Sequence, residues 1–239
     1  MTKLTKSDWK IPVLLLTLSM APLLGGISRL TDMSANTITH DNARFIVSPV
    51  PIIMHVVAAT LYSLLGAFQF SKGFRLRWPG VHRRAGKVLA VCGLIAALTG
   101  VWMSLAYAIP IPMQGPILRV VRVILGLAMA ASIVTAWASI MRRKVPRHEA
   151  FMIRAYAIGQ GAGTQALILG PWMVITGNST GLTRDLLMAL SWAINIGVAE
   201  LIIWTRKRRL SPKASRRATN LSAGYAHVES TGARGAVAS

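Results

Sequence analysis

Six long apolar segments constrain the fold of this chain more than any other feature of its sequence. Each approaches or exceeds the roughly 20 residues that a helix needs to cross a hydrocarbon core of about 30 Å. They run over residues 11–27, 46–70, 87–108, 118–141, 150–176 and 185–204. Continuous apolar runs favour helices over the alternating strands of a membrane barrel. The sequence therefore predicts an all-α fold, a polytopic membrane helix bundle of about six transmembrane helices.

The composition supports the membrane class. Hydrophobic residues make up 53% of the 239-residue chain, and the formal net charge is +20. This apolar content exceeds what one soluble globule of this length can bury, and it excludes disordered and disulfide-framed proteins as well. Cys92 stands alone in the sequence, so it cannot close an intrachain disulfide or build a multi-cysteine metal site. We expect it to be a small buried hydrophobe.

The positive charges predict how the bundle is oriented. Of 27 Lys and Arg residues, 21 lie before the first segment, in the second-to-third and fourth-to-fifth loops, or after the last segment. Five lie on the opposite side. Because cytoplasmic loops carry excess Lys and Arg, both termini are expected in the cytoplasm. The same charges would attract anionic lipid headgroups, and nucleic acid is not an expected partner.

The two ends of the chain carry separate expectations. Basic residues before the apolar run 11–27 are also typical of a signal peptide, but the run is long and its cleavage signal is weak, which favours a retained first helix. Residues 205–239 are basic and rich in Ser, Ala and Gly. We therefore predict a transmembrane domain over residues 1–204 and a disordered cytoplasmic tail over 205–239.

Polar residues follow one face of the second predicted helix. His55, Tyr62, Gly66 and Gln69 fall within a few tens of degrees of one another at about 100° per residue. Buried ionisable groups in a membrane are costly and usually functional, so His55 is a candidate haem or metal ligand or a proton carrier. The alternative is a histidine that is hydrogen-bonded between helices and binds no ligand.

Two further histidines begin the third and fifth predicted helices. His82 and His148 lie at the same depth on helices of the same direction, so a paired site for haem b or a transition metal is geometrically feasible if these two helices are neighbours. Neutral imidazole is a good ligand for either cofactor. The alternative is two interfacial histidines that contact lipid headgroups or cap their helices.

The fifth predicted helix is polar on two sides. Tyr156, Gln160 and Thr164 advance by four residues, and three glycines lie within 159–163. Together with Tyr62 and Gln69 on the second helix, these side chains are candidates for lining a cavity for a quinone, haem or substrate. The alternative is interhelical hydrogen bonding, with the glycines permitting close helix approach.

Two charged residues and one proline within the predicted spans carry further expectations. Arg154 and Glu200 lie about one turn inside the same end of two antiparallel helices, which predicts a structural ion pair. A proton-coupling role for Glu200 is the alternative. Pro171, late in the fifth helix, is expected to kink it there.

Three motifs occur in order along the helices. His55 precedes the sequence LGAFQF at 65–70, HRxxG occupies 82–86, and HxxxMxRxYA occupies 148–157. Over about residues 45–175 this pattern resembles a family of predicted bacterial multi-pass membrane proteins, classed as a domain of unknown function. Phe151 departs from the Trp of that pattern. The resemblance implies a multi-pass inner-membrane protein and points to His55, His82, His148 and Arg154, but it implies no reaction.

The sequence leaves three functions open. The best supported is a histidine-centred haem, metal or small-ligand protein of redox type. The alternatives are a transporter with a polar pocket among the second, third and fifth helices, or a non-catalytic scaffold or accessory subunit. A protein partner or quinone is compatible with each of them. P-loop, nucleophile-elbow, zinc-hydrolase and dinucleotide fingerprints are missing from the sequence, so soluble-type catalysis is not expected, and enzymatic activity is left open.

Overall fold

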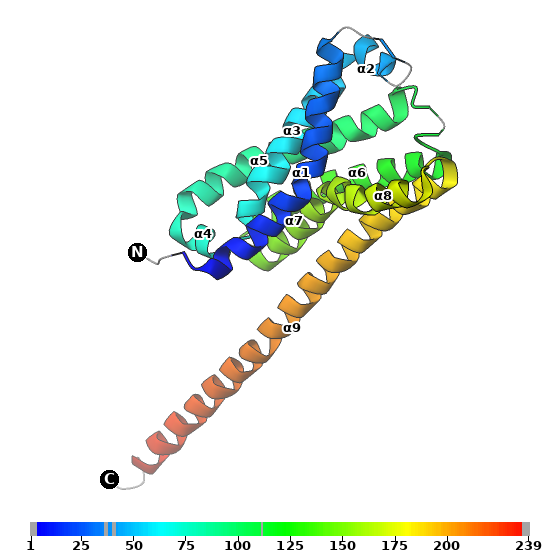
Figure 1. Ribbon diagram of the computed structural model, residues 1–239. Helices are drawn as coiled ribbons and strands as arrows, with labels where there is room; N and C mark the ends of the chain where they lie inside the picture. The colour runs from blue at the N-terminus through cyan, green and yellow to red at the C-terminus, as the bar shows by residue number, and fades with distance from the viewer. Residues whose placement is uncertain (1–3, 36–37, 40–41, 111, 236–239) are drawn as a thin grey trace. The chain divides into compact units, whose positions relative to one another are not determined.

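The computed structural model describes residues 4–35, 38–39, 42–110 and 112–235, with side chains described up to residue 208 (Figure 1). Every regular element in these residues is a helix, which confirms the predicted all-α fold. In chain order the helices are α1 (Lys6–Ser34), α2 (Ala43–Val47), α3 (Pro49–Gln69), α4 (Lys72–Arg77), α5 (Pro79–Ala106), α6 (Pro116–Met141), α7 (Val145–Gly159), α8 (Gly161–Thr176) and α9 (Gly181–Gly235).

Five helices in the described part of the chain are long and apolar enough to cross a membrane. They are α1, α3, α5, α6 and the portion Gly181–Arg208 of α9. In their most apolar windows only 17–39% of the residues are buried, so most of the apolar side chains face outward. Leu14 and Leu105, for example, are 68% and 61% exposed. A soluble protein rarely exposes so much apolar surface, whereas lipid would cover it. These features establish a multi-pass membrane protein.

Prolines fix where several helices begin. α3, α5, α6 and α7 each carry proline in the first turn, where the missing N–H costs nothing and the fixed φ favours a helix. At the start of α1, Thr5 and Asp8 form a capping box, in which the Thr5 backbone N–H donates to Asp8 Oδ2 at 2.9 Å. The helix starts therefore follow directly from local sequence.

The main core lies where α3, α5, α6 and α7 pack together. α3 packs on α5, α5 on α6, and α6 on α7, while α1 lies against α3 and α8 (Figure 1). Small side chains allow this close approach, among them Ala58, Ala96, Ala97 and Ala155. Cys92 belongs to the same core and is a free, buried thiol, as expected.

The predicted fifth span consists of two helices. α7 ends at Gly159, α8 begins at Gly161, and Gln160 forms a turn between them. A single helix over 150–176 was therefore the wrong expectation, and the interruption is not at Pro171, because α8 continues through that residue. Each piece is too short to cross a hydrocarbon core of about 30 Å alone. The interruption depends on contacts that other helices make with the turn at Gln160.

The chain divides into two compact units, Met1–Ala199 and Glu200–Ser239. The first contains α1 to α8 and the beginning of α9, and the second contains the remainder of α9. The backbone is helical as far as Gly235, where the sequence predicts a disordered tail. An isolated helix is marginal in water, so disorder of the tail in solution stays a prediction.

Candidate functional site

The turn at Gln160 leaves backbone carbonyls at the end of α7 without helical partners. Two side chains of α9 bind them. Trp192 Nε1 donates to the carbonyl of Ile158 at 3.1 Å, and Asn195 Nδ2 donates to the carbonyl of Ala157 at 3.2 Å. Trp192 and Asn195 are three residues apart and so share one face of α9. Interrupted helices are tolerated in membranes where neighbouring side chains satisfy the freed backbone in this way.

The Gln160 side chain joins three helices through hydrogen bonds. Gln160 Nε2 donates to Ser19 Oγ of α1 at 3.0 Å and to the Tyr156 hydroxyl of α7 at 2.8 Å. The Tyr156 hydroxyl in turn donates to the carbonyl of Ser63 in α3 at 2.6 Å. Ser19, Tyr156 and Gln160 are each at most 5% exposed. The interruption is therefore the centre of a buried polar network.

Tyr62 lies beside the interruption with its hydroxyl unsatisfied. Its ring centroid is 5.6 Å from that of Tyr156, and Gly159 is close enough that a Cβ there would lie 3.1 Å from Tyr62 Cε1. Tyr62 is 2% exposed, yet its hydroxyl has no hydrogen-bond partner among the described residues. Nε2 of the buried Gln165, in α8, is in the same condition. Buried polar groups are normally paired, so each is a place where a ligand or water would be stabilised.

The structure gathers most of the predicted cavity-lining residues around the interruption. Thr164 joins the set indirectly, because its hydroxyl donates to Asn195 Oδ1 at 2.8 Å. Gln69 does not join it by any described contact, since its Oε1 lies beside Gly86 at the start of α5. Apolar residues of the core enclose Tyr62 and Tyr156. In this conformation the gathered side chains are packed rather than arranged around an open pocket.

His55 is bound by the neighbouring helix. Its Nδ1 lies 2.9 Å from the carbonyl of Ala96 and 3.1 Å from Thr99 Oγ1, both in α5. A Cβ at Gly100 would lie 3.3 Å from the imidazole Cε1, so the ring packs closely against the α5 backbone. This geometry matches the interhelical hydrogen bonding that the sequence offers as one interpretation. Ligand binding by His55 stays a prediction.

His82 and His148 interact electrostatically, and Arg75 and Glu149 act on His82 as well. Nδ1 of His148 donates to the carbonyl of Ala136 at 3.0 Å, whereas Nδ1 of His82 is buried and has no hydrogen-bond partner among the described residues. An ion pair of 3.2 Å joins Arg75 in α4 to Glu149 in α7. Across the described residues no three or more His, Cys, Asp or Glu side chains form a metal-binding group, so a metal or haem there stays a prediction.

The predicted ion pair of Arg154 and Glu200 involves both compact units. The Arg154 guanidinium lies 5.1 Å from the centroid of the Phe151 ring, a cation–π contact within α7. Glu200 is the first residue of the second unit, and the pair stays a prediction. His40, which the sequence places in an outer loop, lies outside the described residues.

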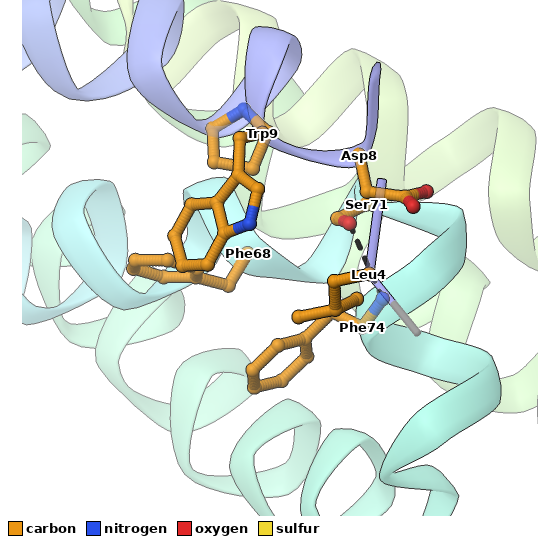
Figure 2. Close-up of a pocket in the computed structure, with 7 residues that line it drawn as sticks. Leu4, Asp8, Trp9, Phe68, Ser71 and Phe74 are labelled. Atoms are coloured by element: carbon orange, nitrogen blue, oxygen red, sulfur yellow. Dashed lines mark hydrogen bonds between the residues drawn. The ribbon is translucent and has the colours of Figure 1, made fainter. Parts of the chain in front are cut away.

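A separate pocket lies between the start of α1, the end of α3 and α4 (Figure 2). Asp8 at its edge accepts a hydrogen bond from the backbone N–H of Gly73 at 3.0 Å, which attaches α1 to α4. The lining is largely apolar and aromatic, which is typical of a membrane interface; it comprises Leu4, Asp8, Trp9, Pro12, Phe68, Ser71 and Phe74.

Sequence reasoning missed three residues that hold the interruption. Ser19 is a small hydroxyl in an apolar helix, and Trp192 and Asn195 lie within the last predicted span. Asn195 did carry a signal, because an amide inside a membrane span is costly unless it is paired. Trp192 carried none, since its ring is apolar enough to face lipid, and only the fold shows its N–H bonded to Ile158.

Comparison with known proteins gives one result that bears on the whole bundle. Residues 52–203 match the family model described as "Predicted membrane protein (DUF2306)". The matched region extends from α3 into α9 and includes the interruption and all three histidines discussed above. No curated protein and no solved structure matches the chain.

Proposed function

We propose, from the premise that this chain belongs to the DUF2306 family of predicted membrane proteins, that it is a carrier for a small polar solute. Its binding site would be the interruption between α7 and α8. We further propose that the protein lies in a bacterial inner membrane with both termini in the cytoplasm, the orientation that the charge distribution favours.

One observation carries the carrier proposal. The buried Tyr62 hydroxyl lies beside an interrupted helix and has no hydrogen-bond partner in the part of the chain that the structure describes. Broken helices near the middle of the bilayer are typical of transporters, where they provide backbone and side-chain groups for substrate. Here the Tyr62 hydroxyl would provide a free donor and acceptor. Gln160 and Tyr156 would exchange their mutual hydrogen bond for bonds to solute at little net cost.

The packed state around Tyr62 fits a carrier in its closed conformation. A carrier must open a path to water, and two short helices joined at one turn can move more independently than one continuous helix. The polar contacts that would break on opening include those of Trp192 and Asn195 with the α7 carbonyls, and that of Ser19 with Gln160.

Cysteine labelling tests whether water reaches the site. In a Cys92→Ala background, Gln160→Cys would be treated with a charged, water-soluble thiol reagent in nanodiscs, beside Leu167→Cys as the control. Leu167 lies in α8, seven residues away, and is 66% exposed on the apolar surface, so lipid would shield it. A carrier predicts labelling of the first variant and protection of the second. If neither variant is labelled, the polar core is sealed from water, which would favour a scaffold function.

A histidine-centred cofactor protein is the second candidate. The observation that favours it is the hydrogen bond from His148 Nδ1 to the Ala136 carbonyl, because such a bond typically orients the other ring nitrogen toward a metal. A reduced-minus-oxidised absorbance spectrum of protein purified from haem-sufficient cells tests the haem version. A Soret and α-band signal that His148→Ala removes would support it, and a colourless preparation would exclude it.

A further inference from the structure

The side chains that form hydrogen bonds at the interruption are uncharged near neutral pH. The polar group of each is a hydroxyl, an amide or an indole N–H. They are Ser19, Tyr156, Gln160, Thr164, Trp192 and Asn195. The nearest charged residue along α7, Arg154, lies roughly 160° around that helix from Tyr156, and its guanidinium contacts the Phe151 ring. Recognition at the interruption therefore depends on hydrogen bonds between neutral groups.

The two helix ends that meet at Gln160 add little net charge. The last carbonyls of a helix carry partial negative charge, and the first N–H groups carry partial positive charge. Because α7 ends at Gly159 and α8 begins at Gly161, these opposite partial charges lie next to one another and largely cancel. An ion would have no opposite charge to bind there, and leaving water for such surroundings is costly for an ion.

Two buried groups beside the interruption can bind a solute, and both can donate a hydrogen bond. They are the Tyr62 hydroxyl and Nε2 of Gln165, which have no hydrogen-bond partner in the described part of the chain. The two residues are 2% and 7% exposed. Gln165 lies four residues after Gly161 and so shares the face of α8 that packs against Trp192. A matching solute therefore presents at least one acceptor oxygen.

Close packing around the two tyrosine rings limits the size of the solute. A Cβ at Gly66 in α3 would lie 2.6 Å from Tyr156 Cε2, and a Cβ at Gly93 in α5 would lie 2.7 Å from Tyr62 Cε2. The rings thus lie directly against the backbones of these helices. A bulky solute would have to separate the helices, whereas a small one would require only the tyrosine rings to move.

We propose that the interruption binds a small uncharged solute with a carbonyl or hydroxyl oxygen, of the urea, amide or polyol type. This inference rests on the proposed carrier function and names the class of its solute. Tyr62 and Gln165 would donate to oxygens of the solute, and the Gln160 amide can both donate and accept. A carboxylate or a cation of the same size would be excluded, because neither would have a charged partner at the site.

Equilibrium exchange of radiolabelled probes in proteoliposomes tests the solute class, with protein-free liposomes as the background. Two pairs of probes share a shape and differ in charge: acetamide with acetate, and urea with guanidinium. Glycerol is the fifth probe. Exchange moves no net charge across the membrane, so charged and uncharged probes can be compared directly. We expect exchange of at least one uncharged probe through the protein, about tenfold or more faster than exchange of acetate or guanidinium.

Two variants at the site and one control locate the effect. Tyr62→Phe and Gln165→Leu should each slow exchange of the uncharged probe about tenfold, since each removes a hydrogen-bond donor. Tyr107→Phe is the matched control. The Tyr107 hydroxyl donates to the carbonyl of Ser48 at 2.6 Å, and its ring belongs to a separate core cluster at the end of α5. Exchange through this variant should be unchanged.

The solute class and the carrier function fail on different results. Exchange of acetate or guanidinium as fast as that of the uncharged probes would overturn the class and leave a carrier. Exchange of no uncharged probe would overturn the class alone if Gln160→Cys is labelled by the thiol reagent, and would exclude the carrier as well if Gln160→Cys is protected. Equal slowing in Tyr107→Phe and Tyr62→Phe would overturn the assignment of the solute to this site.

Discussion

At the scale of single residues, Asp185 shows how one carboxylate can organise the junction of two helices. It begins the sixth predicted span, where the sequence suggests only a charge at the membrane surface. In the fold it is almost fully buried and accepts two backbone N–H groups at the start of α6. Gly115 is required there, because a Cβ on it would collide with the Asp185 carboxylate.

Replacing Asp185 should therefore destabilise the bundle. We expect Asp185→Ala to lower the free energy of unfolding by about 2 kcal/mol, since two N–H groups lose a charged acceptor. Asp32→Ala, at an exposed acid of α1, should change it by no more than about 0.5 kcal/mol. Denaturant titration in mixed micelles measures both. Equal effects of the two variants would show that the Asp185 cap contributes no special stability.

Tyr62 and Tyr156 offer a second comparison at this scale. The Tyr156 hydroxyl donates to Ser63 and accepts from Gln160, so Tyr156→Phe should cost about 1–2 kcal/mol. The Tyr62 hydroxyl has no partner among the described residues, so Tyr62→Phe should leave stability unchanged or slightly raised when no solute is present. Thermal unfolding measures the difference. A larger loss in Tyr62→Phe would mean that its hydroxyl is already bonded in the empty protein.

At the scale of elements, the interruption between α7 and α8 depends on close packing by α9. A Cβ at Gly161 would collide with the Trp192 ring, whereas a Cβ at Gly170 in the same helix would meet nothing within 4 Å. We expect Gly161→Ala to displace Trp192 and lower the unfolding free energy by about 1–3 kcal/mol. Gly170→Ala should be neutral or slightly stabilising. A neutral Gly161→Ala would show that Trp192 is not needed at the interruption.

The elements also show what the sequence could and could not predict. Apolar length was enough to predict α3, α5 and α6, because that signal is local, although α5 begins at Pro79, ahead of the predicted span 87–108. The interruption at Gln160 was not predictable, because it depends on Trp192 and Asn195, more than 30 residues later in the chain. Periodicity did place Tyr156 and Gln160 at one polar site with Tyr62. It could not distinguish packed side chains from an open pocket.

Charged and ionisable residues also differ in whether the sequence alone could predict their surroundings. Equal depth on helices of the same direction made a paired His82–His148 site feasible if the two helices are neighbours; the two residues interact electrostatically, and the paired site stays a prediction. The partners of His55 are the backbone carbonyl of Ala96 and the Thr99 hydroxyl, and no side-chain pattern could indicate the carbonyl.

At the scale of the whole molecule, topology depends on the path of α7 and α8. If the pair crosses the membrane, the five long helices and this pair make six crossings, and the two termini lie on the same side. If the pair enters and returns, five crossings put the termini on opposite sides. The charge distribution predicts the first arrangement. Reporter fusions at each terminus should both show cytoplasmic activity, and an external C-terminus would contradict it.

A carrier cycle requires that the interruption at Gln160 opens to water. Its most direct test is labelling of Gln160→Cys, in the Cys92→Ala background, in sealed proteoliposomes of uniform orientation. A membrane-impermeant thiol reagent is applied outside in one sample and trapped inside in another. A carrier predicts labelling of Gln160→Cys from both sides, with Leu167→Cys protected in each sample. Protection of Gln160→Cys from both sides would contradict it.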